Sequence, residues 1–115
     1  MNESGEKFMS LEVDKINNTI AQFPDYLSPL EILDVYYRTE AAEGEEITTH
    51  EDKISKTESE VTLVHSGLQD DSVESEKYVL TAKLANGEWM ITKIQKNWKC
   101  QLGRGHQEFG VEPCE

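Results

Sequence analysis

Four side chains near the C-terminus have the types and the spacing that could do chemistry. Cys100 and Cys114 are the only cysteines of the chain, and Arg104 and His106 lie between them. Two thiols and an imidazole could ligate a soft metal ion, an arginine could bind an anion, and two cysteines could form a disulfide. The segment is therefore a metal site, an anion site or a structural clasp, and we expect the clasp.

The metal alternative has three ligands, Cys100, His106 and Cys114, but it lacks the paired C-x-x-C or H-x-x-x-H spacing of zinc motifs. We therefore expect no metal and no other cofactor. A disulfide between the two cysteines would enclose 13 residues. Closing a loop of this length stabilises a fold by about 3 kcal/mol in the chain-entropy model. The bond would also tie a chain end, which otherwise frays, to the last strand.

The clasp hypothesis also gives Arg104 an acidic partner. A guanidinium can bind a carboxylate through two parallel hydrogen bonds, and the flanking Gly103 and Gly105 permit a tight backbone around it. Asp70 and Asp71 lie in the connection between two expected strands, where turn chemistry also explains them. We expect Arg104 to pair with one of these two carboxylates and to hold the tail against the sheet.

Aromatic side chains offer a second place for binding. Small-ligand pockets are apolar with a few polar groups, but aromatic residues more often form the core of a domain. The aromatic residues that could line a pocket between helices and a curved sheet are Tyr26, Tyr36, Tyr37, Trp89 and Trp98.

We expect a non-enzymatic domain that binds a small molecule or a protein. No Ser or Cys lies at an informative distance from a histidine to indicate a nucleophile with its base. The alternative is an isomerase- or hydrolase-type enzyme that uses a pocket carboxylate or His106 as acid or base. In either case the residues that we expect to contact a ligand are Tyr37, Trp98, Arg104 and His106.

Two helices are predicted ahead of these groups. Apolar residues at spacings of 4, 3, 4 and 3 predict an amphipathic helix that ends at Pro24. Ser28 and Pro29 mark the start of a second helix, with Glu31 in the capping-box position, and this helix is expected to run to about Ala42. The apolar stripe of the first helix consists of Met9, Val13, Ile16, Ile20 and Phe23.

Strands are predicted over the rest of the chain. Runs rich in Thr, Ile and Val indicate an exposed strand at 46–54 and a strand with a clearer pattern at 59–66. Asn86-Gly87 between two β-rich runs predicts a hairpin with a type I′ turn.

The register that this turn sets places apolar pairs on both faces of the hairpin. Positions that sum to 173 face each other: Leu84 with Trp89 and Ala82 with Ile91 on one face, Val79 with Ile94 and Thr81 with Thr92 on the other. Either a β-bulge swaps the buried face along the strand, or the sheet is covered on both sides.

These elements predict an α+β fold in which two N-terminal helices pack on a curved antiparallel sheet of three to four strands. We expect a disordered tail at 1–7 and a single domain over 8–115, because 115 residues suit one core. The strand at 46–54 could pair edge to edge with a second copy and form a homodimer.

The formal net charge of −12 argues against a nucleic-acid partner or an anionic membrane, since both require a concentrated positive surface. No apolar run is long enough to span a bilayer, so we expect no membrane insertion. As written, the chain is expected to be cytoplasmic; if an N-terminal signal has been removed, it is expected to be exported or periplasmic.

Several of these residues together resemble a group of small uncharacterised bacterial domains. The shared pattern is "LDDSV … W … W-[KR]-C-x-x-G-R-G-H-Q", and such domains often follow an export or lipoprotein signal. The likeness covers about residues 28–115 and implies no activity. Here Gln69 stands inside the first motif, and the leading signal is missing. The matching residues are Leu68, Asp70–Val73, Trp89, Trp98–Cys100, Gly103–Gln107 and Cys114.

More loosely, helices followed by a bent antiparallel sheet resemble the cystatin-like and nuclear-transport-factor-2-like folds. Members of these folds include ketosteroid-isomerase-type enzymes and many plain binding domains. The resemblance is one of architecture, so it implies no particular function.

Overall fold

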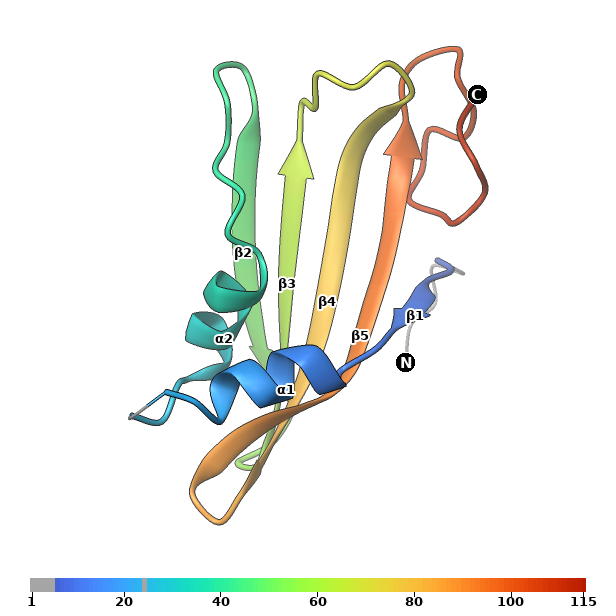
Figure 1. The fold of residues 1–115 in the computed structure, drawn as a ribbon. Helices are drawn as coiled ribbons and strands as arrows, with labels where there is room; N and C mark the ends of the chain where they lie inside the picture. The colour runs from blue at the N-terminus through green and yellow to red at the C-terminus, as the bar shows by residue number, and fades with distance from the viewer. Residues whose placement is uncertain (1–5, 24) are drawn as a thin grey trace.

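The computed structural model describes residues 6–23 and 25–115 of the chain and consists mainly of a β-sheet (Figure 1). Two short helices precede four long strands, and a further short strand precedes the helices. The elements are β1 (Met9–Leu11), α1 (Asp14–Ile20), α2 (Pro29–Tyr36), β2 (Glu46–Lys53), β3 (Glu58–Ser66), β4 (Val73–Ala85) and β5 (Glu88–Cys100).

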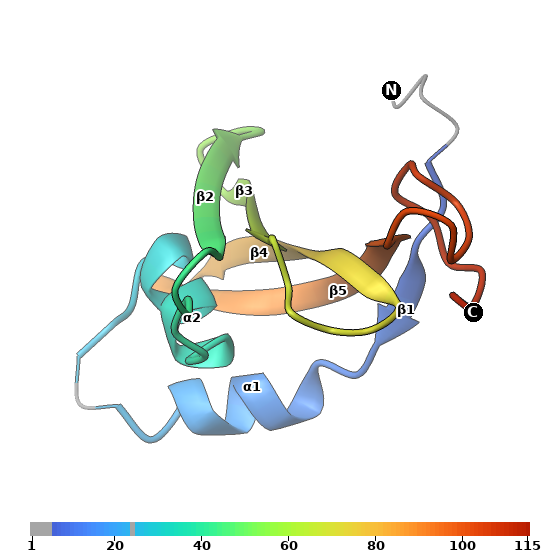
Figure 2. The ribbon, with the colours of Figure 1, turned by 90° about the horizontal axis from the view of Figure 1, so that it is seen from above.

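All five strands form one antiparallel sheet in the order β1-β5-β4-β3-β2. The strands predicted at 46–54 and 59–66 are confirmed as β2 and β3, and β2 lies at one edge of the sheet. Seen from above, the strands turn strongly relative to one another, and both helices lie on the same side of β4 and β5 (Figure 2).

The predicted helix over Met9–Phe23 is wrong in its first part. Met9 to Leu11 form β1, which pairs with Ile94 to Lys96 of β5. The backbone groups at that edge of β5 are free to pair, and a strand there satisfies them. The ends of the apolar stripe stay outside the core, because Met9 is 42% exposed and Phe23 is 37% exposed. Pro24, at the expected helix end, lies outside the described residues.

The second helix begins as predicted and ends early. The Ser28 hydroxyl accepts from the backbone N–H of Glu31, and the Glu31 carboxylate accepts from the backbone N–H of Ser28, so the capping box is present. The last helical residue is Tyr36 instead of Ala42, because Tyr37 adopts an extended conformation and directs its ring towards β3 and β4.

The hairpin is confirmed, and a bulge explains its two apolar faces. Asn86 and Gly87 have φ values of 54° and 78°, as a type I′ turn requires. Ala82 faces Ile91 as predicted, but the register then shifts between Thr81 and Ala82, so that Ile94 faces Leu80 instead of Val79. The extra residue brings Ile91 and Ile94 to the same buried face.

The core lies between the helices and one face of the sheet. Ile16 of α1 and Ile32 and Leu33 of α2 pack on buried side chains of the three central strands. The α+β class is confirmed, but the finer prediction is wrong: the sheet has five strands instead of three or four, β1 precedes the helices, and the helices are only 7 and 8 residues long. No helix in the described part of the chain has the length and apolar character to cross a membrane.

The N-terminal segment is held by Asn97, which is fully buried on β5. Its side-chain amide donates to a carboxylate oxygen of Glu6 at 2.8 Å and to the carbonyl of Lys7 at 3.0 Å. Glu6 and Lys7 were assigned to a disordered tail over 1–7, and both instead contact the sheet. Residues 1–5 of that expected tail lie outside the described residues.

Asn17 joins α1 to the sheet. Its amide nitrogen donates to the carbonyl of Ile91, and its amide oxygen accepts from the N–H of Ile91, both at 2.9 Å. We expect Asn17→Ala to lower the free energy of unfolding by about 1–3 kcal/mol, because it removes both partners of a buried peptide group. The neighbouring exposed Asn18→Ala is the control and should change stability by less than about 0.5 kcal/mol. Urea unfolding of the two variants checks this, and equal effects would contradict it.

Candidate functional site

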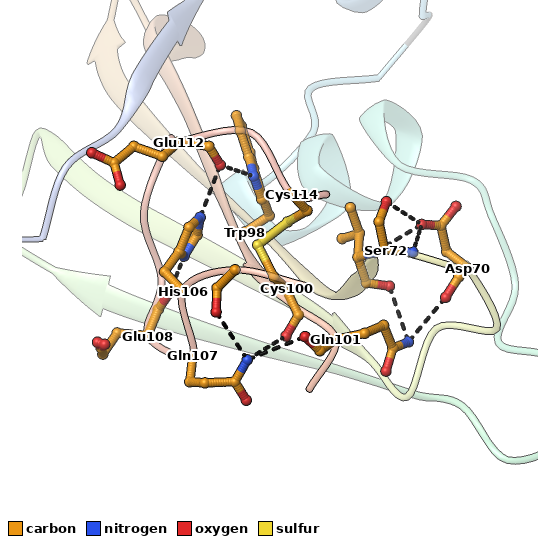
Figure 3. The surroundings of a disulfide bond; sticks show 12 residues. Asp70, Ser72, Trp98, Cys100, Gln101, His106, Gln107, Glu108, Glu112 and Cys114 are labelled. Atoms are coloured by element: carbon orange, nitrogen blue, oxygen red, sulfur yellow. Dashed lines mark hydrogen bonds between the residues drawn. A yellow bond between two sulfur atoms is a disulfide. The ribbon is translucent and has the colours of Figure 1, made fainter. Parts of the chain in front are cut away.

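The C-terminal tail forms a closed loop at one end of the sheet (Figure 3). Cys100, the last residue of β5, is joined to Cys114 by a disulfide with the two Cα atoms 5.5 Å apart, so the expected disulfide is present. Cys100 is only 2% exposed, and Cys114 is half-buried. A backbone bridge between Trp98 and Gly110 holds the loop a second time, with N–H···O distances of 3.0 and 2.9 Å.

His106 crosses the middle of the loop and has both ring nitrogens occupied. Nδ1 lies 2.7 Å from the carbonyl oxygen of Glu108, and Nε2 lies 2.9 Å from that of Glu112. A carbonyl oxygen can only accept, so both contacts are hydrogen bonds when the ring is an imidazolium. These bonds to Glu108 and Glu112 accordingly raise the pKa of His106 above its usual value. In its protonated form the ring therefore joins two carbonyl oxygens of the loop and stabilises the loop.

The raised pKa of His106 predicts how stability depends on pH. The stabilising contribution is fully present below the unfolded-state value of 6.5 and is lost as the pH rises through the higher folded-state pKa. We expect His106→Gln to destabilise the protein most on the acid side of 6.5 and progressively less in mildly alkaline buffer. Thermal unfolding of both proteins across that window measures the difference. A difference that grows with pH would contradict the assigned charge state.

The structure does not bring Arg104 to the carboxylates expected to pair with it. The Arg104 side chain is exposed, and among the described residues no carboxylate lies within ion-pair distance of its guanidinium. Asp70 instead accepts from the backbone N–H groups of Ser72 and Val73, and these bonds lower its pKa. Asp71 is exposed. Arg104 therefore does not make the expected ion pair with Asp70 or Asp71.

Two glutamines hold the tail in place of Arg104, and sequence reasoning missed both. The Gln101 amide donates to the carbonyls of Leu68 and Asp70 at 3.0 and 3.1 Å, which ties the tail to the β3–β4 connection. The Gln107 amide donates to three carbonyls inside the loop, those of Cys100, Gln101 and Gly105. Only their positions in the sequence could have indicated a role in the tail: Gln101 directly follows Cys100, and Gln107 is the last residue of the G-R-G-H-Q run.

A different concave surface lies between the helices and β4. It is an open groove of about 760 Å³ with three tyrosines in its walls, Tyr36, Tyr37 and Tyr78. The Tyr78 ring lies 5.9 Å from that of Tyr36 and 5.2 Å from that of Tyr37, between ring centroids. The residues of the N-terminal wall include Glu12, Asp14, Lys15, Ile16, Asn18 and Thr19.

Tyr37 is fixed by a buried relay of hydrogen bonds. Its hydroxyl lies 2.7 Å from Nδ1 of His65, and Nε2 of His65 lies 2.8 Å from a carboxylate oxygen of Glu45. The Glu45 carboxylate can only accept, so Nε2 carries the proton, and in the singly protonated ring Nδ1 accepts from the tyrosine. In that form the hydroxyl proton points at His65, and the side chain of Thr39 is a second hydrogen-bond partner of Tyr37.

The surroundings shift the pKa values of Tyr37 and Glu45, the two outer groups of the relay. Burial, with the negative charges of Glu76 and Glu45 nearby, raises the pKa of Tyr37 to about 12, so its hydroxyl stays protonated in neutral solution. The backbone N–H of Ala42 and the His65 ring both donate to Glu45 and lower the pKa of its carboxyl group. His65 is 2% exposed, so the relay is closed to solvent at its centre.

The four residues predicted to contact a ligand therefore separate into two places. Tyr37 lies in the groove, whereas Arg104 and His106 belong to the tail that follows β5. Trp98 lies on β5 itself, and the Lys96 ammonium lies 6.0 Å from the centroid of its ring and 5.2 Å from that of Tyr78. Trp98 serves the loop, because its indole N–H donates to the carbonyl of Glu112 at 3.0 Å. Tyr78 in the groove wall and His65 in the relay complete this site, and sequence reasoning selected neither.

Comparison of the chain with family models, with curated proteins and with solved structures finds no match. The resemblance of residues 28–115 to small bacterial domains stays a prediction, and the site must be interpreted from its own geometry.

Proposed function

We propose that the protein is a non-enzymatic domain that binds a small molecule in the groove between α1, α2 and β4. The single observation that carries this proposal is the cluster of three tyrosine rings around Tyr78 in the wall of that groove. A volume of about 760 Å³ falls in the range of about 300–1,000 Å³ that is usual for small-ligand sites.

The chemistry of the walls favours a flat, partly apolar ligand that can donate a hydrogen bond. Aromatic rings pack well against flat apolar groups. When His65 is singly protonated at Nε2, the Tyr37 proton is directed at Nδ1 and the phenolic oxygen keeps acceptor capacity. Glu12 and Asp14 in the same groove also accept and carry negative charge. A hydroxyl, amine or amide N–H on an aromatic or cyclic framework satisfies all three features.

The isomerase- or hydrolase-type alternative has less support. Both ring nitrogens of His106 are occupied by carbonyl oxygens, so neither is available to move a proton to or from a substrate. The groove carboxylates Glu12 and Asp14 are exposed, whereas catalytic carboxyl groups are usually desolvated to shift their pKa values. The relay behind Tyr37 fits a positioning role for a ligand-facing oxygen.

The proposal is tested by fragment binding. A library of flat aromatic and cyclic fragments is screened by thermal shift, and the best binder is titrated against Tyr36→Ala and Tyr26→Ala. Tyr26 is 69% exposed and lies outside the groove, so it is the matched control. We expect Tyr36→Ala to weaken binding about two- to tenfold, since stacking on an aromatic ring contributes about 0.5–1.5 kcal/mol. No binder, or equal affinity in all three proteins, would refute the proposal.

A further inference from the structure

Three ligands of soft metal ions meet in the C-terminal tail. The sulfur atoms of Cys100 and Cys114 and a ring nitrogen of His106 all lie within 4.8 Å of one another. In a tetrahedral zinc site, bonds of about 2.0–2.3 Å place neighbouring ligand atoms about 3.3–3.8 Å apart. The two sulfur atoms are bonded to each other in the disulfide, so they must separate after reduction to reach this spacing, while the His106 nitrogen already lies within 4.8 Å of both. The same three residues were considered as ligands from the sequence and rejected on their spacing; the loop, and not a short motif, brings them together.

The loop is shaped around these three groups. A Cβ atom at Gly105 would lie 2.8 Å from the sulfur of Cys100, at a φ of 147° that side chains rarely adopt, so only glycine fits there. A Cβ atom at Gly110 would lie 3.5 Å from the ring of His106. The backbone therefore passes close to the sulfur of Cys100 at Gly105 and close to the imidazole of His106 at Gly110.

We propose that Cys100, Cys114 and His106 form a binding site for a soft divalent cation such as Zn²⁺ when the disulfide is reduced. Reduction by two equivalents of a low-molecular-weight thiol breaks the S–S bond and yields two protein thiols and the disulfide of the reductant. The metal ion then replaces the two thiol protons and one proton of the imidazolium, and three protons leave. Two thiolates and a neutral imidazole coordinate the ion, and a water molecule takes the fourth position.

Contacts that do not involve sulfur keep the ligands near one another after reduction. The backbone bridge of Trp98 with Gly110, the Trp98 indole bond to Glu112 and the Gln107 amide bonds all remain possible without the disulfide. Coordination costs one of the two carbonyl contacts of His106, since the ligating nitrogen must give up its proton. A site that is largely assembled beforehand needs little further ordering of the chain, which favours binding.

Cobalt binding tests the proposal. The protein is reduced with a phosphine, freed of excess reductant under anaerobic conditions and titrated with Co²⁺. We expect a thiolate-to-cobalt charge-transfer band and the visible bands of tetrahedral cobalt to saturate at one equivalent, and Zn²⁺ to remove them. The unreduced protein should show neither band. Absence of the bands in the reduced protein overturns the proposal, whether or not the tail keeps its structure.

Variants separate the three-ligand site from unspecific thiol binding. Loss of an outer-shell partner already costs about 10–100-fold in affinity, so His106→Gln, which removes a direct ligand, is expected to weaken Co²⁺ binding at least about 100-fold. Glu112→Gln is the matched control, because its carboxylate is not a ligand and only its carbonyl contacts His106. Near-UV circular dichroism of Trp98 reports whether each reduced variant keeps the tail folded. Equal affinity of wild type and His106→Gln contradicts the assignment of the ring as a ligand.

Discussion

Replacing Cys100 and Cys114 together by alanine is expected to lower the free energy of unfolding by about 3 kcal/mol. The two residues are 14 positions apart and covalently joined, so the bond removes from the unfolded chain the entropy of an open loop of that length. The hydrogen bonds of Trp98, Gln107 and His106 hold the folded loop but leave the unfolded chain unconstrained. They therefore do not compensate for the loss. For a chain of this size the melting temperature should fall by roughly 10–20 °C.

Reductant supplies the control for this result. Wild-type protein in a thiol-free phosphine, with metal ions removed, should unfold at the same denaturant concentration as the double variant, and the double variant should not respond to reductant. If reduction leaves the midpoint of the wild type unchanged, the hydrogen-bonded network alone fixes the tail and the clasp role of the sulfur bridge is wrong.

Local signals predicted the elements whose formation depends on neighbouring residues. The capping box at Ser28 and the turn at Asn86-Gly87 are chemical requirements met within a few positions, and both formed as expected. The helix prediction at Met9 was wrong, although the apolar spacing there suits a helix. The segment instead pairs with the free edge of β5, some 85 positions later in the sequence, where Met9 faces Lys96. Pairing of that kind depends on the assembled sheet and has no local signal.

In the candidate site, too, local features could be predicted from the sequence and long-range contacts could not. The disulfide could be anticipated because the chain has just two cysteines. The failure of Arg104 to pair could not be anticipated, because it depends on which other groups already occupy the expected carboxylate and the β3–β4 connection. Asp70 is already occupied by the backbone of its own turn, and Gln101 reaches the β3–β4 connection that Arg104 was expected to hold. The relay joins His65 of β3 to Tyr37, which follows α2, and to Glu45, which precedes β2, so residue types alone gave no indication of it.

Ile32→Ala is expected to cost about 2–5 kcal/mol, the usual range for removing a fully enclosed aliphatic side chain. Ile32 is 0% exposed and lies in the middle of α2, where it contacts the sheet core. A helix of 8 residues has little stability of its own, so its attachment depends on the few side chains that it buries. Alanine has the higher helix propensity, hence any loss arises from packing and not from the helix itself.

Leu30→Ala on the same helix is the matched comparison, since Leu30 is 39% exposed and the change in helix propensity is small. Its cost should stay below about 1 kcal/mol. Urea unfolding followed by far-UV circular dichroism measures both values. Because α2 ends with Tyr36 and Tyr37 follows it directly, the Ile32 variant should also bind a groove fragment more weakly than its lower stability alone explains. Similar costs for the two variants would mean that α2 is not anchored through Ile32, and the groove would then lack the rigid wall on which ligand binding depends.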